Sequence, residues 1–429
     1  MEERLTLDIT ALDAEGRGVA RNAEGKVVFV EGALPGEIVE TRPLHGKRSF
    51  DVARAVSILR ESPARRTPRC PHFGVCGGCA TQHADSRTQV AAKQRWLEDC
   101  LERIGKVRAQ CLLPPLYGEE WGYRRRARLS VRHVPSKGAL VGFRERRSTF
   151  VADMLSCEVL PPSASALIPR LRALISALSI RDRVPQVEIA IGDEATVLVF
   201  RHLLPLTEAD QTSLRRFAED NGIHVWLQPA GPESAAPLHP SGRDVLRYSL
   251  PEFGIRIAFE PTHFTQVNDP INRALVSRVM RLLDPRPGER IADLFCGLGN
   301  FSLPIARLGA HVVGFEASSA LVERARANAR ANGLVAQFEA ADLFRSRIDP
   351  FGPFGKILLD PPREGAVEIL KKVGKDWPSR IVYVSCDPAT LARDAAVLVH
   401  THGFTLQAAG VVNMFPHTAH VESVALFER

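Results

Sequence analysis

The chain has 429 residues, of which 45% are hydrophobic and 24% charged, with a formal net charge of +7. This composition indicates two or three globular domains with an ample core and excludes a largely disordered chain. No apolar run approaches the ~20 residues that span a bilayer, and the first residues lack the apolar stretch of a secretory signal. We therefore expect a cytoplasmic protein with no membrane partner, whose eight cysteines serve metal binding or catalysis rather than disulfides.

Residues 1–60 are expected to form a first domain, a small β-barrel. Short strands are predicted by alternating or β-branched residues over 5–9, 27–30, 37–40 and 50–58, with glycines and Pro35-Gly36 between them. Closely spaced strands of this kind are typical of barrels that bind oligonucleotides, although a purely structural cap domain fits the same pattern. Residues 61–68 have the composition of a linker.

A cysteine cluster follows the linker. Cys70, Cys76 and Cys79 have the spacing C-x5-C-x2-C, with three glycines among them that let the backbone wrap tightly. Three thiolates need a fourth ligand, and we favour Cys157 over the other candidates, which are His83, Cys100 and Cys111. All-sulfur ligation suits zinc or an iron–sulfur cluster, and spacing alone does not choose between them. The spacing differs from the C-x3-C-x2-C of radical enzymes that cleave S-adenosylmethionine (SAM).

Residues 61–262 are expected to form a central α+β domain with a basic surface. A helical pattern covers residues 87–104 and ends at Gly105, and residues 123–150 alternate basic and apolar side chains as a strand with a cationic face would. The arginines are clustered, at Arg65 and Arg66, at Arg124–Arg126 with Arg128, and at Arg144 with Arg146 and Arg147. Clustered cations are the footprint of a nucleic-acid partner, and a solvated basic face is the alternative.

Residues 263–429 are expected to form a third domain with alternating strands and helices. Buried strands are predicted over 291–295, 311–315, 338–341, 357–359 and 381–384, each followed by a turn or a helix. Two further strands, 404–412 and 423–427, would complete the sheet. Alternating βα units predict an α/β fold of the doubly wound, Rossmann-like type with a mostly parallel sheet.

The ends of these strands carry the residues expected to bind a cofactor. The first strand runs into Cys296-Gly297-Leu298-Gly299-Asn300, which lacks the full glycine pattern of a dinucleotide phosphate cradle. SAM has no pyrophosphate, and the turn at Gly297 would meet its amino-acid part. Glu316 and Asp342 end the next two strands and supply carboxylates, and Asp360 ends the fourth. We therefore favour SAM over NAD.

Cys386 follows the fifth strand, where such sheets bind their ligands. A buried structural thiol is the alternative. A cysteine beside SAM suggests methylation of a pyrimidine, because a thiolate that adds to C6 makes C5 nucleophilic. A base must then remove the C5 proton, and residues 414–422 offer His417, His420 and Glu422 as candidates.

Together these motifs resemble the RNA uracil-C5 methyltransferases, and in particular the iron–sulfur members that act on 23S ribosomal RNA. The likeness covers nearly the whole chain. It implies a TRAM-type RNA-binding barrel over residues 1–58 and a C-terminal SAM-dependent methyltransferase domain. It also implies a [4Fe-4S] cluster in the central domain, held by Cys70, Cys76, Cys79 and Cys157.

The resemblance also assigns roles to single residues. Cys386 falls on the nucleophile and Glu422 on the general base. The positions that contact SAM correspond to Gln266, Phe295, Glu316, Asp342 and Asp360. The chain departs from the family at Asp387, where Asn is frequent, and at Pro362, where close members have Ala. These departures leave the exact target nucleotide open.

The family plan implies that the helix near residues 90–105 packs on the catalytic domain. We expect the cluster to be structural, because the sequence shows no open ligand position and no redox partner. Members that act on tRNA are expected to lack both cluster and barrel, which favours 23S ribosomal RNA as the partner. We expect a monomer with no obligate protein partner. Three alternatives stay open: the same chemistry on another 23S or tRNA uridine, a cytosine-C5 RNA methyltransferase, and a non-catalytic RNA-binding protein that holds SAM or a metal.

Overall fold

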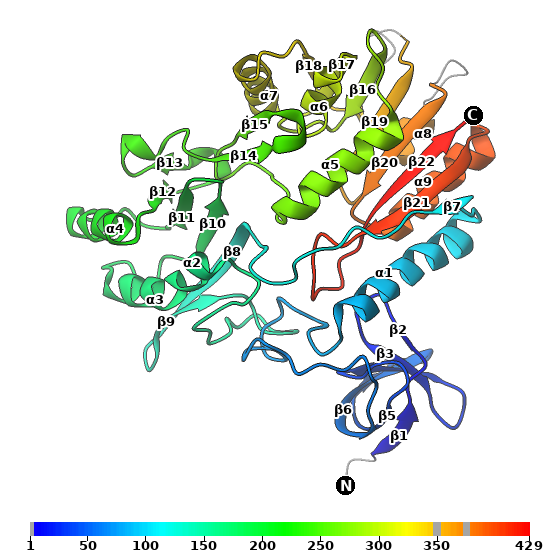
Figure 1. The fold of residues 1–429 in the computed structure, drawn as a ribbon. Coiled ribbons are helices and arrows are strands. Elements are labelled where there is room, and N and C mark those ends of the chain that lie inside the picture. Colours follow the sequence, from blue (N-terminus) through cyan, green and yellow to red (C-terminus); the bar gives the residue numbers. More distant parts are fainter. Residues whose placement is uncertain (1–3, 346–352, 372–377) are drawn as a thin grey trace.

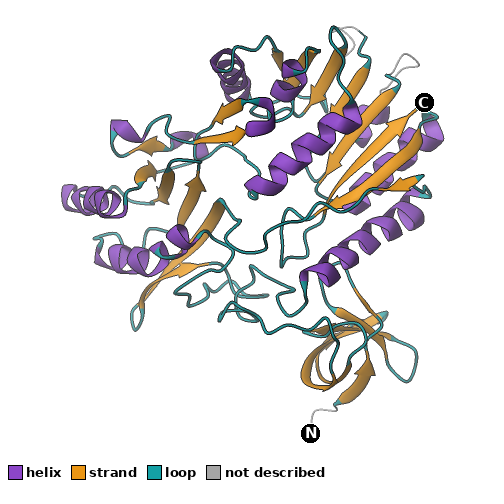
Figure 2. Cartoon of the chain, viewed as in Figure 1, coloured by secondary structure: helices purple, strands orange, loops and turns teal. Residues whose placement is uncertain are grey.

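The computed structural model describes residues 4–345, 353–371 and 378–429. The chain folds into three regions that pack against one another: a small N-terminal β-sheet, a mixed central region, and a large sheet with helices on both faces (Figure 1). Figure 2 shows that strands dominate the N-terminal region, whereas helices and strands alternate in the other two. Of the helices in the described ranges, none is both long enough and apolar enough to cross a membrane.

The N-terminal region is a six-stranded sheet with the order β1-β5-β6-β4-β3-β2. Its strands are β1 (Leu5–Asp8), β2 (Ala11–Leu12), β3 (Gly18–Arg21), β4 (Val27–Glu31), β5 (Ile38–Gly46) and β6 (Phe50–Arg60). Its small core includes Leu7, Val28, Val30 and Val39. Three register shifts between β5 and β6 bend these long strands and let the sheet curl. The predicted strands are confirmed, with β5 and β6 longer than expected.

The central region is a second six-stranded sheet, with the order β13-β12-β11-β10-β8-β9. Its elements are β8 (Arg126–Val134), β9 (Gly138–Gly142), α2 (Pro162–Ser165), α3 (Leu167–Ala177), β10 (Gln186–Ile191), β11 (Thr196–Arg201), α4 (Glu208–Asn221), β12 (His224–Gln228) and β13 (Ala236–Pro237). Helices α3 and α4 pack on one face. The single long strand expected over 123–150 is wrong, because β8 turns back after Val134 and pairs with β9.

The large sheet has eight strands in the order β18-β17-β16-β19-β20-β22-β21-β7. Its elements are β7 (Cys111–Leu112), α5 (Asp269–Leu283), β16 (Arg290–Leu294), α6 (Ser302–Arg307), β17 (His311–Glu316), α7 (Ser319–Ala331), β18 (Gln337–Ala340), β19 (Lys356–Leu359), α8 (Val367–Lys371), β20 (Arg380–Ser385), α9 (Pro388–Ala396), β21 (Thr405–Val412) and β22 (Glu422–Glu428). Strands β16–β20 are parallel, and β22 inserts antiparallel between β20 and β21. The predicted mostly parallel, doubly wound sheet is confirmed.

Both faces of the large sheet are covered, so its strands alternate between two cores. Leu358 and Val382 face the core beneath α5, α6 and α7, whereas Leu359 and Tyr383 face the core beneath α8 and α9. Helix α1 (Ser86–Cys100) and the π-turn after it (Leu101–Gly105) join the second core through Leu97, Cys100 and Leu101. This helix, which lies between the first two regions in sequence, therefore packs on the large sheet (Figure 1).

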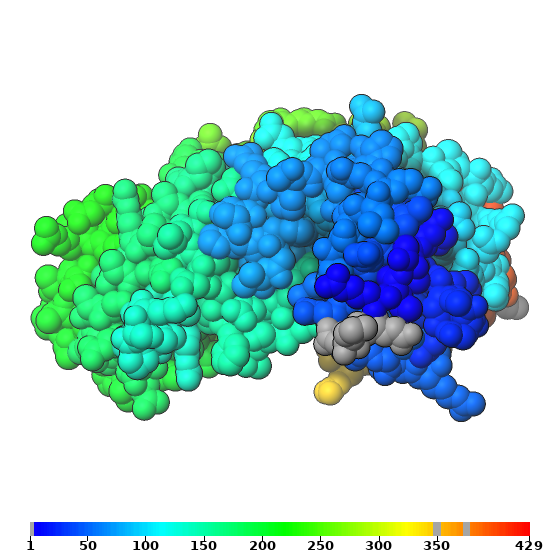
Figure 3. All heavy atoms as spheres, turned by 90° about the horizontal axis from the view of Figure 1, so that it is seen from below, coloured from blue at the N-terminus to red at the C-terminus, as the bar shows by residue number. Residues whose placement is uncertain are grey.

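The central and large sheets share one continuous core. The face of the central sheet opposite α3 packs on a hairpin of β14 (Arg247–Leu250) and β15 (Ile255–Ala258), and the hairpin's buried side chains also contact α5 and α7. Viewed from below, the N-terminal sheet, the cysteine-rich segment and the central region form one unbroken surface (Figure 3). The three regions therefore act as one packed body, in which segments far apart in sequence build shared sites.

Candidate active site

The carboxyl ends of the parallel strands line up along one edge of the large sheet. From β18 to β20 the residues at or just beyond these ends are Asp342, Glu316, Gly297, Asp360 and Cys386. The strand order reverses between β16 and β19, which is the switch point where open α/β sheets bind ligands. The polar residues singled out from the sequence therefore meet at this edge.

Cys386 and Glu422 lie at the same end of two neighbouring strands. In the antiparallel pair β20–β22, Ser385 is the partner of Ser423; Cys386 directly follows Ser385, and Glu422 directly precedes Ser423. Glu422 is also the partner of Val412 at the end of β21. It is 6% exposed, and its Oε2 has no hydrogen-bond partner within the described part of the chain. A half-buried thiol and a buried carboxyl that lacks one hydrogen-bond partner therefore lie close enough to interact beside the cofactor edge.

Burial and neighbouring charges raise the pKa values of these groups. Burial raises the pKa of Cys386 to about 11, with further increases from Glu422 and Asp360 and a decrease from Arg363. Burial and Asp360 raise the pKa of Glu422 to about 8, against a decrease from Lys93. Burial raises the pKa of Asp360 to about 7. Near neutral pH the two carboxyls are largely or partly protonated, which limits their repulsion of a Cys386 thiolate.

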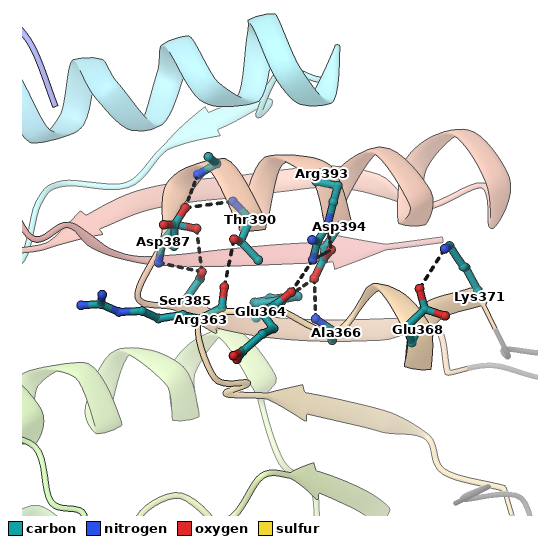
Figure 4. A network of polar contacts seen from close by, with 12 residues as sticks. Arg363, Glu364, Ala366, Glu368, Lys371, Ser385, Asp387, Thr390, Arg393 and Asp394 are labelled. Carbon is teal, nitrogen blue, oxygen red and sulfur yellow. Dashed lines mark hydrogen bonds and ion pairs between the residues drawn. The ribbon is translucent and has the colours of Figure 1, made fainter. Parts of the chain in front are cut away.

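A polar network fixes the bend that presents Cys386 (Figure 4). Asp387 begins α9 as its N-cap and accepts hydrogen bonds from the backbone N–H of Ala389 and Thr390, at 2.9 and 3.0 Å. Ser385 Oγ donates to the Asp387 carbonyl oxygen at 3.0 Å. An Asn side chain at position 387 carries the same acceptor oxygen, so the departure from the family pattern leaves this cap intact.

The same network ties α9 to the segment that follows Asp360. Thr390 Oγ1 donates to the Arg363 carbonyl oxygen at 3.0 Å, and the backbone N–H of Ala366 donates to Asp394 Oδ2 at 2.6 Å. The Tyr383 hydroxyl donates to the same Asp394 oxygen at 2.7 Å. The thiol, Asp360 and Arg363 therefore sit on segments that are fixed relative to one another.

The cofactor edge is built around the turn after β16. Phe295 has a φ of 67°, in the left-handed region that non-glycine residues rarely adopt. Gly297 donates its backbone N–H to Glu316 Oε2 at 3.2 Å, and Ser318 donates its own to Glu316 Oε1 at 3.0 Å. The Phe295 ring lies 5.7 Å, centroid to centroid, from the Phe344 ring. The turn therefore brings the Glu316 carboxyl group and the Phe295 ring to the same edge of the sheet.

Two further residues expected to contact the cofactor, Asp342 and Gln266, lie outside this turn. Asp342 lies after β18 with its side chain 48% exposed, and its Oδ1 accepts the backbone N–H of Phe344 at 3.1 Å. Gln266 precedes α5 in a segment joined to residues 413–415, because Asn268 Nδ2 donates to the Met414 carbonyl oxygen at 3.3 Å. Gln266 is thereby anchored beside the loop that leads to Glu422.

The four cysteines expected to hold a cluster line one cavity of about 210 Å³. Cys70, Cys76 and Cys157 are buried, Cys79 is half-buried, and all four are free thiols. Burial raises the pKa of Cys79 to about 11 and that of Cys157 to about 12, and each thiol also feels the charges of its neighbours. The other candidates for a fourth ligand, His83, Cys100 and Cys111, do not line this cavity.

No three Cys, His, Asp or Glu side chains of the described residues are arranged to hold a single metal ion. The donor set nevertheless fits a metal group, since four thiols converge on one cavity without forming a disulfide. Thr418 and His420, from the loop before Glu422, line the same cavity. The cysteine site and the sheet edge are therefore neighbours.

Several clustered arginines have structural partners. Arg65 forms an ion pair with buried Glu37, and Arg125 pairs with Asp193. Both Arg126 and Arg128 pair with Glu188 on β10. Arg17, Arg144, Arg146 and Arg147 line a groove of about 480 Å³ between the N-terminal sheet and the cysteine segment. Some of these also have partners, since Arg17 pairs with Asp13 and Arg147 with Glu31, and Glu31 lines the same groove. Most arginines of the sequence clusters therefore hold the fold together, and those of the third cluster also line this groove.

Sequence reasoning missed three residues of this region. Asp293 is fully buried in β16, accepts a hydrogen bond from Ser302 Oγ, and has a pKa raised to about 7 by burial. Arg363 lies close enough to Cys386 to lower its pKa. Lys93 of α1 is buried beside Glu422. One signal for Lys93 was present, since Val90, Lys93 and Leu97 have the spacing of a single helix face.

Two known family models match most of the chain. A family model described as tRNA (Uracil-5-)-methyltransferase matches residues 118–429, and one described as TRAM domain matches residues 3–42. The chain is 59% identical to the 23S rRNA (uracil(1939)-C(5))-methyltransferase RlmD of Aromatoleum aromaticum, over 98% of this chain and 99% of that protein. It is 58% identical to the protein of the same name from Nitrosospira multiformis, over 98% of each.

A solved structure shares the whole fold. The tRNA (uracil-54, C5)-methyltransferase of Pyrococcus abyssi, in complex with S-adenosyl-L-homocysteine, matches with a TM-score of 0.77 and 24% identity. The match covers 98% of this chain and 99% of that chain, so it includes the N-terminal sheet. The expectation that members acting on tRNA lack the barrel is therefore wrong, and the barrel alone does not separate the two classes of RNA.

Proposed function

The chain belongs to the RNA uracil-C5 methyltransferase family, and we propose that it methylates C5 of one uridine in 23S ribosomal RNA, the counterpart of uracil 1939. The proximity of Cys386, just after β20, to Glu422, at the start of β22, is the observation that carries this reaction. The substrate is supported by relatives of 54–59% identity, matched over nearly the full chain, that all bear the same name.

The proposed reaction uses two protein groups in sequence. The Cys386 thiolate adds to C6 of the uracil, which makes C5 nucleophilic enough to take the methyl group of SAM. Glu422 then removes the C5 proton, and the electron pair of that C–H bond expels the thiolate from C6. The products are 5-methyluridine, S-adenosylhomocysteine and a proton held by Glu422. Arg363 supports the first step, because its charge lowers the pKa of the thiol.

SAM would lie along the ends of β16–β19 and supply an electrophilic methyl group. Glu316 would accept hydrogen bonds from the ribose hydroxyls, as acidic residues at this strand end do in related folds. Gly297 offers backbone at the turn, and Phe295 an aromatic face. Gln266, Asp342 and Asp360 complete the proposed set. For Phe295, Gly297, Glu316, Asp342 and Asp360 this assignment is supported by a common position along one sheet edge, and for Gln266 by the bond that joins its segment to Met414.

A [4Fe-4S] cluster is proposed for the cavity formed by Cys70, Cys76, Cys79 and Cys157. Thiolates are the ligands that such clusters use, and four thiols line this one cavity. We assign the group a structural role, since the Cys79–Thr81 segment supports residues near Glu422. A coloured protein that bleaches in air and carries four irons per chain supports this assignment, whereas one bound zinc overturns it.

The proposed organisation has three domains: a TRAM-type domain over 1–60, a central cluster and RNA-binding domain over 61–262, and a methyltransferase domain over 263–429. The arginine-lined groove between the N-terminal sheet and the cysteine segment supports an RNA partner, because cations at an open surface attract phosphates. We propose a cytoplasmic monomer with no obligate protein partner.

The first test uses RNA that contains 5-fluorouridine. Fluorine at C5 cannot leave as a proton does, so the covalent adduct persists on a denaturing gel. We expect an adduct with a 23S fragment and SAM, its loss in Cys386→Ala, and its retention in Cys111→Ala, which removes an exposed thiol away from the site. An adduct with tRNA alone keeps the chemistry and changes the substrate. No adduct with either RNA overturns the proposal.

A further inference from the structure

A buried lysine reaches the active site from outside the methyltransferase domain. Lys93 lies in α1 and is 5% exposed. Its Nζ donates to Asn413 Oδ1 and to the Phe415 carbonyl oxygen, each at 2.8 Å. The partners are about 320 residues away in the chain. A lysine is rarely buried without a charged or hydrogen-bonding partner, so this placement needs an explanation.

The two hydrogen bonds of Lys93 hold the chain next to Glu422. Asn413 directly follows β21, whose last residue, Val412, is the strand partner of Glu422. Phe415 lies two residues further along the loop that returns to Glu422. By holding both residues, Lys93 fixes the end of the strand against which Glu422 lies and the start of the loop that carries it.

Other bonds leave the loop little freedom to move. Gln89, one helical turn before Lys93, accepts the backbone N–H of His417 at 2.8 Å. The backbone N–H of Ala80 donates to the His417 carbonyl oxygen at 2.7 Å, and the Tyr123 hydroxyl donates to that of Pro416 at 3.0 Å. The loop is thus held from α1, from the cysteine segment and from the central region, with Lys93 at the end nearest β21.

The charge of Lys93 acts on the carboxyl of Glu422. Burial lowers the pKa of Lys93 to about 7, and Glu422 raises it. The pKa of Glu422 is raised by burial and by Asp360, and Lys93 opposes both effects. Lys93 also lowers the pKa values of His417 and His420, although burial is the main cause for each. Mutual attraction therefore favours the charged forms of Lys93 and Glu422 against the cost of burial.

We propose that Lys93 is a positioning residue for proton abstraction from C5: it fixes the strand end beside Glu422 and, through its charge, keeps a carboxylate available there. This inference rests on the proposed function, in which Glu422 is the base. It assigns α1 a part in the chemistry, although the helix precedes the methyltransferase domain in sequence.

The test measures proton abstraction directly. A 23S fragment that carries tritium at C5 of its uridines releases label to water when the C5 proton leaves, and single-turnover release is followed from pH 6 to 9.5. We expect the acidic limb of this profile to move to higher pH in Lys93→Met and release at pH 7, where Lys93 is partly protonated, to fall several-fold, because Glu422 loses the charge that lowers its pKa. Covalent RNA adduct should accumulate at pH 7, since methyl transfer then outruns proton removal.

Two variants accompany Lys93→Met. Lys93→Arg keeps a permanent charge, and we expect its acidic limb at or below the wild-type position. Lys137→Met is the matched control, because Lys137 is an exposed lysine paired with Asp153 in the central region, and its profile should equal that of the wild type. If Lys93→Met does not fold, Lys93→Arg decides, and an acidic limb shifted upward in that variant overturns the inference.

The outcomes separate the inference from the proposed function. If the wild type releases tritium, Glu422→Gln traps an adduct, and folded Lys93→Met keeps the wild-type profile, only the role of Lys93 is refuted. If the wild type releases no tritium and Glu422→Gln traps no adduct, the proposed function itself fails. A merely structural role for Lys93 predicts a lower melting temperature with an unshifted limb, which also counts against the inference.

Discussion

Removal of the Asp394 carboxylate tests how the nucleophile bend is held. Asp394 is fully buried and accepts hydrogen bonds from the Tyr383 hydroxyl and from the Ala366 backbone N–H (Figure 4). Asp394→Ala strands both donors, each at about 1–3 kcal/mol. The lost ion pair with Arg393 adds little because that side chain is 44% exposed. Part of the loss is offset because a buried carboxylate is also removed, so we expect about 3 kcal/mol of destabilisation.

The partner substitution makes the expectation sharper. Tyr383→Phe alone should cost about 1 kcal/mol, because Asp394 keeps its bonds to Ala366 and Arg393. In the Asp394→Ala background the same change removes a stranded hydroxyl, so it should be neutral or stabilising. The coupling between the two positions should therefore reach about 1–3 kcal/mol.

The assay is urea unfolding of the four proteins at pH 7.5, followed by circular dichroism, with single-turnover methylation of a 23S fragment measured in parallel. Methylation should slow by about tenfold in Asp394→Ala, because the network also holds the segment with Asp360 and Arg363. Additive stabilities in the double variant, or a loss below about 1 kcal/mol in Asp394→Ala, would refute the reasoning.

Three further predictions concern the same pocket. Glu422→Gln should leave SAM binding intact and accumulate a methylated, covalent adduct with unmodified RNA, which a denaturing gel detects. Turnover without such an adduct would show that another residue is the base. Single-turnover tritium release by the wild type should rise as pH increases from 7 to 9, because ionised Glu422, with a pKa of about 8, and the Cys386 thiolate, with a thiol pKa of about 11, both become more abundant. A rate that is flat or falls over this interval contradicts the assignment. Gly365→Ala should destabilise the protein by about 2 kcal/mol or more in thermal unfolding, since φ is +77° and the added carbon would lie 2.3 Å from the Thr390 side chain. The control Gly333→Ala, at φ +63° with open space around it, should cost about 1 kcal/mol. Equal losses in the two variants would show that the crowding at Gly365 is relieved.

The sequence predicted the large sheet well, for a physical reason. Parallel strands covered on both faces are short, continuous apolar runs, as in Ile381–Val384, and such runs are visible without a structure. Because parallel strands end at one edge, the polar residues after each run could be grouped before their geometry was known. The alignment of Glu316, Asp360 and Cys386 follows from this rule.

The parts that failed depend on contacts between distant segments or on turn chemistry. Residues 135–138 contain Pro, Ser and Gly, the composition of a turn, yet the alternation on both sides suggested one strand where β8 and β9 form a hairpin. The position of Lys93 could not be predicted, because its partners lie about 320 residues away. Cys157 was favoured as the fourth cysteine among several candidates, because its position beside Cys70, Cys76 and Cys79 arises only when distant segments fold together.

The adjacency of Cys386 and Glu422 limits how this pocket can be redesigned. Neighbouring strands lie about 4.8 Å apart in a β-sheet, and Cys386 and Glu422 lie at adjacent ends of β20 and β22, so the sheet largely sets the backbone spacing between nucleophile and base. A slip of β22 by one residue would turn Glu422 to the opposite face of the sheet. The charges that act on Cys386 and Glu422 can be changed instead, by substituting Lys93, Asp360 or Arg363. An engineer who seeks a different pH optimum or a more acidic thiol should change these surrounding ions and leave the two strands as they are.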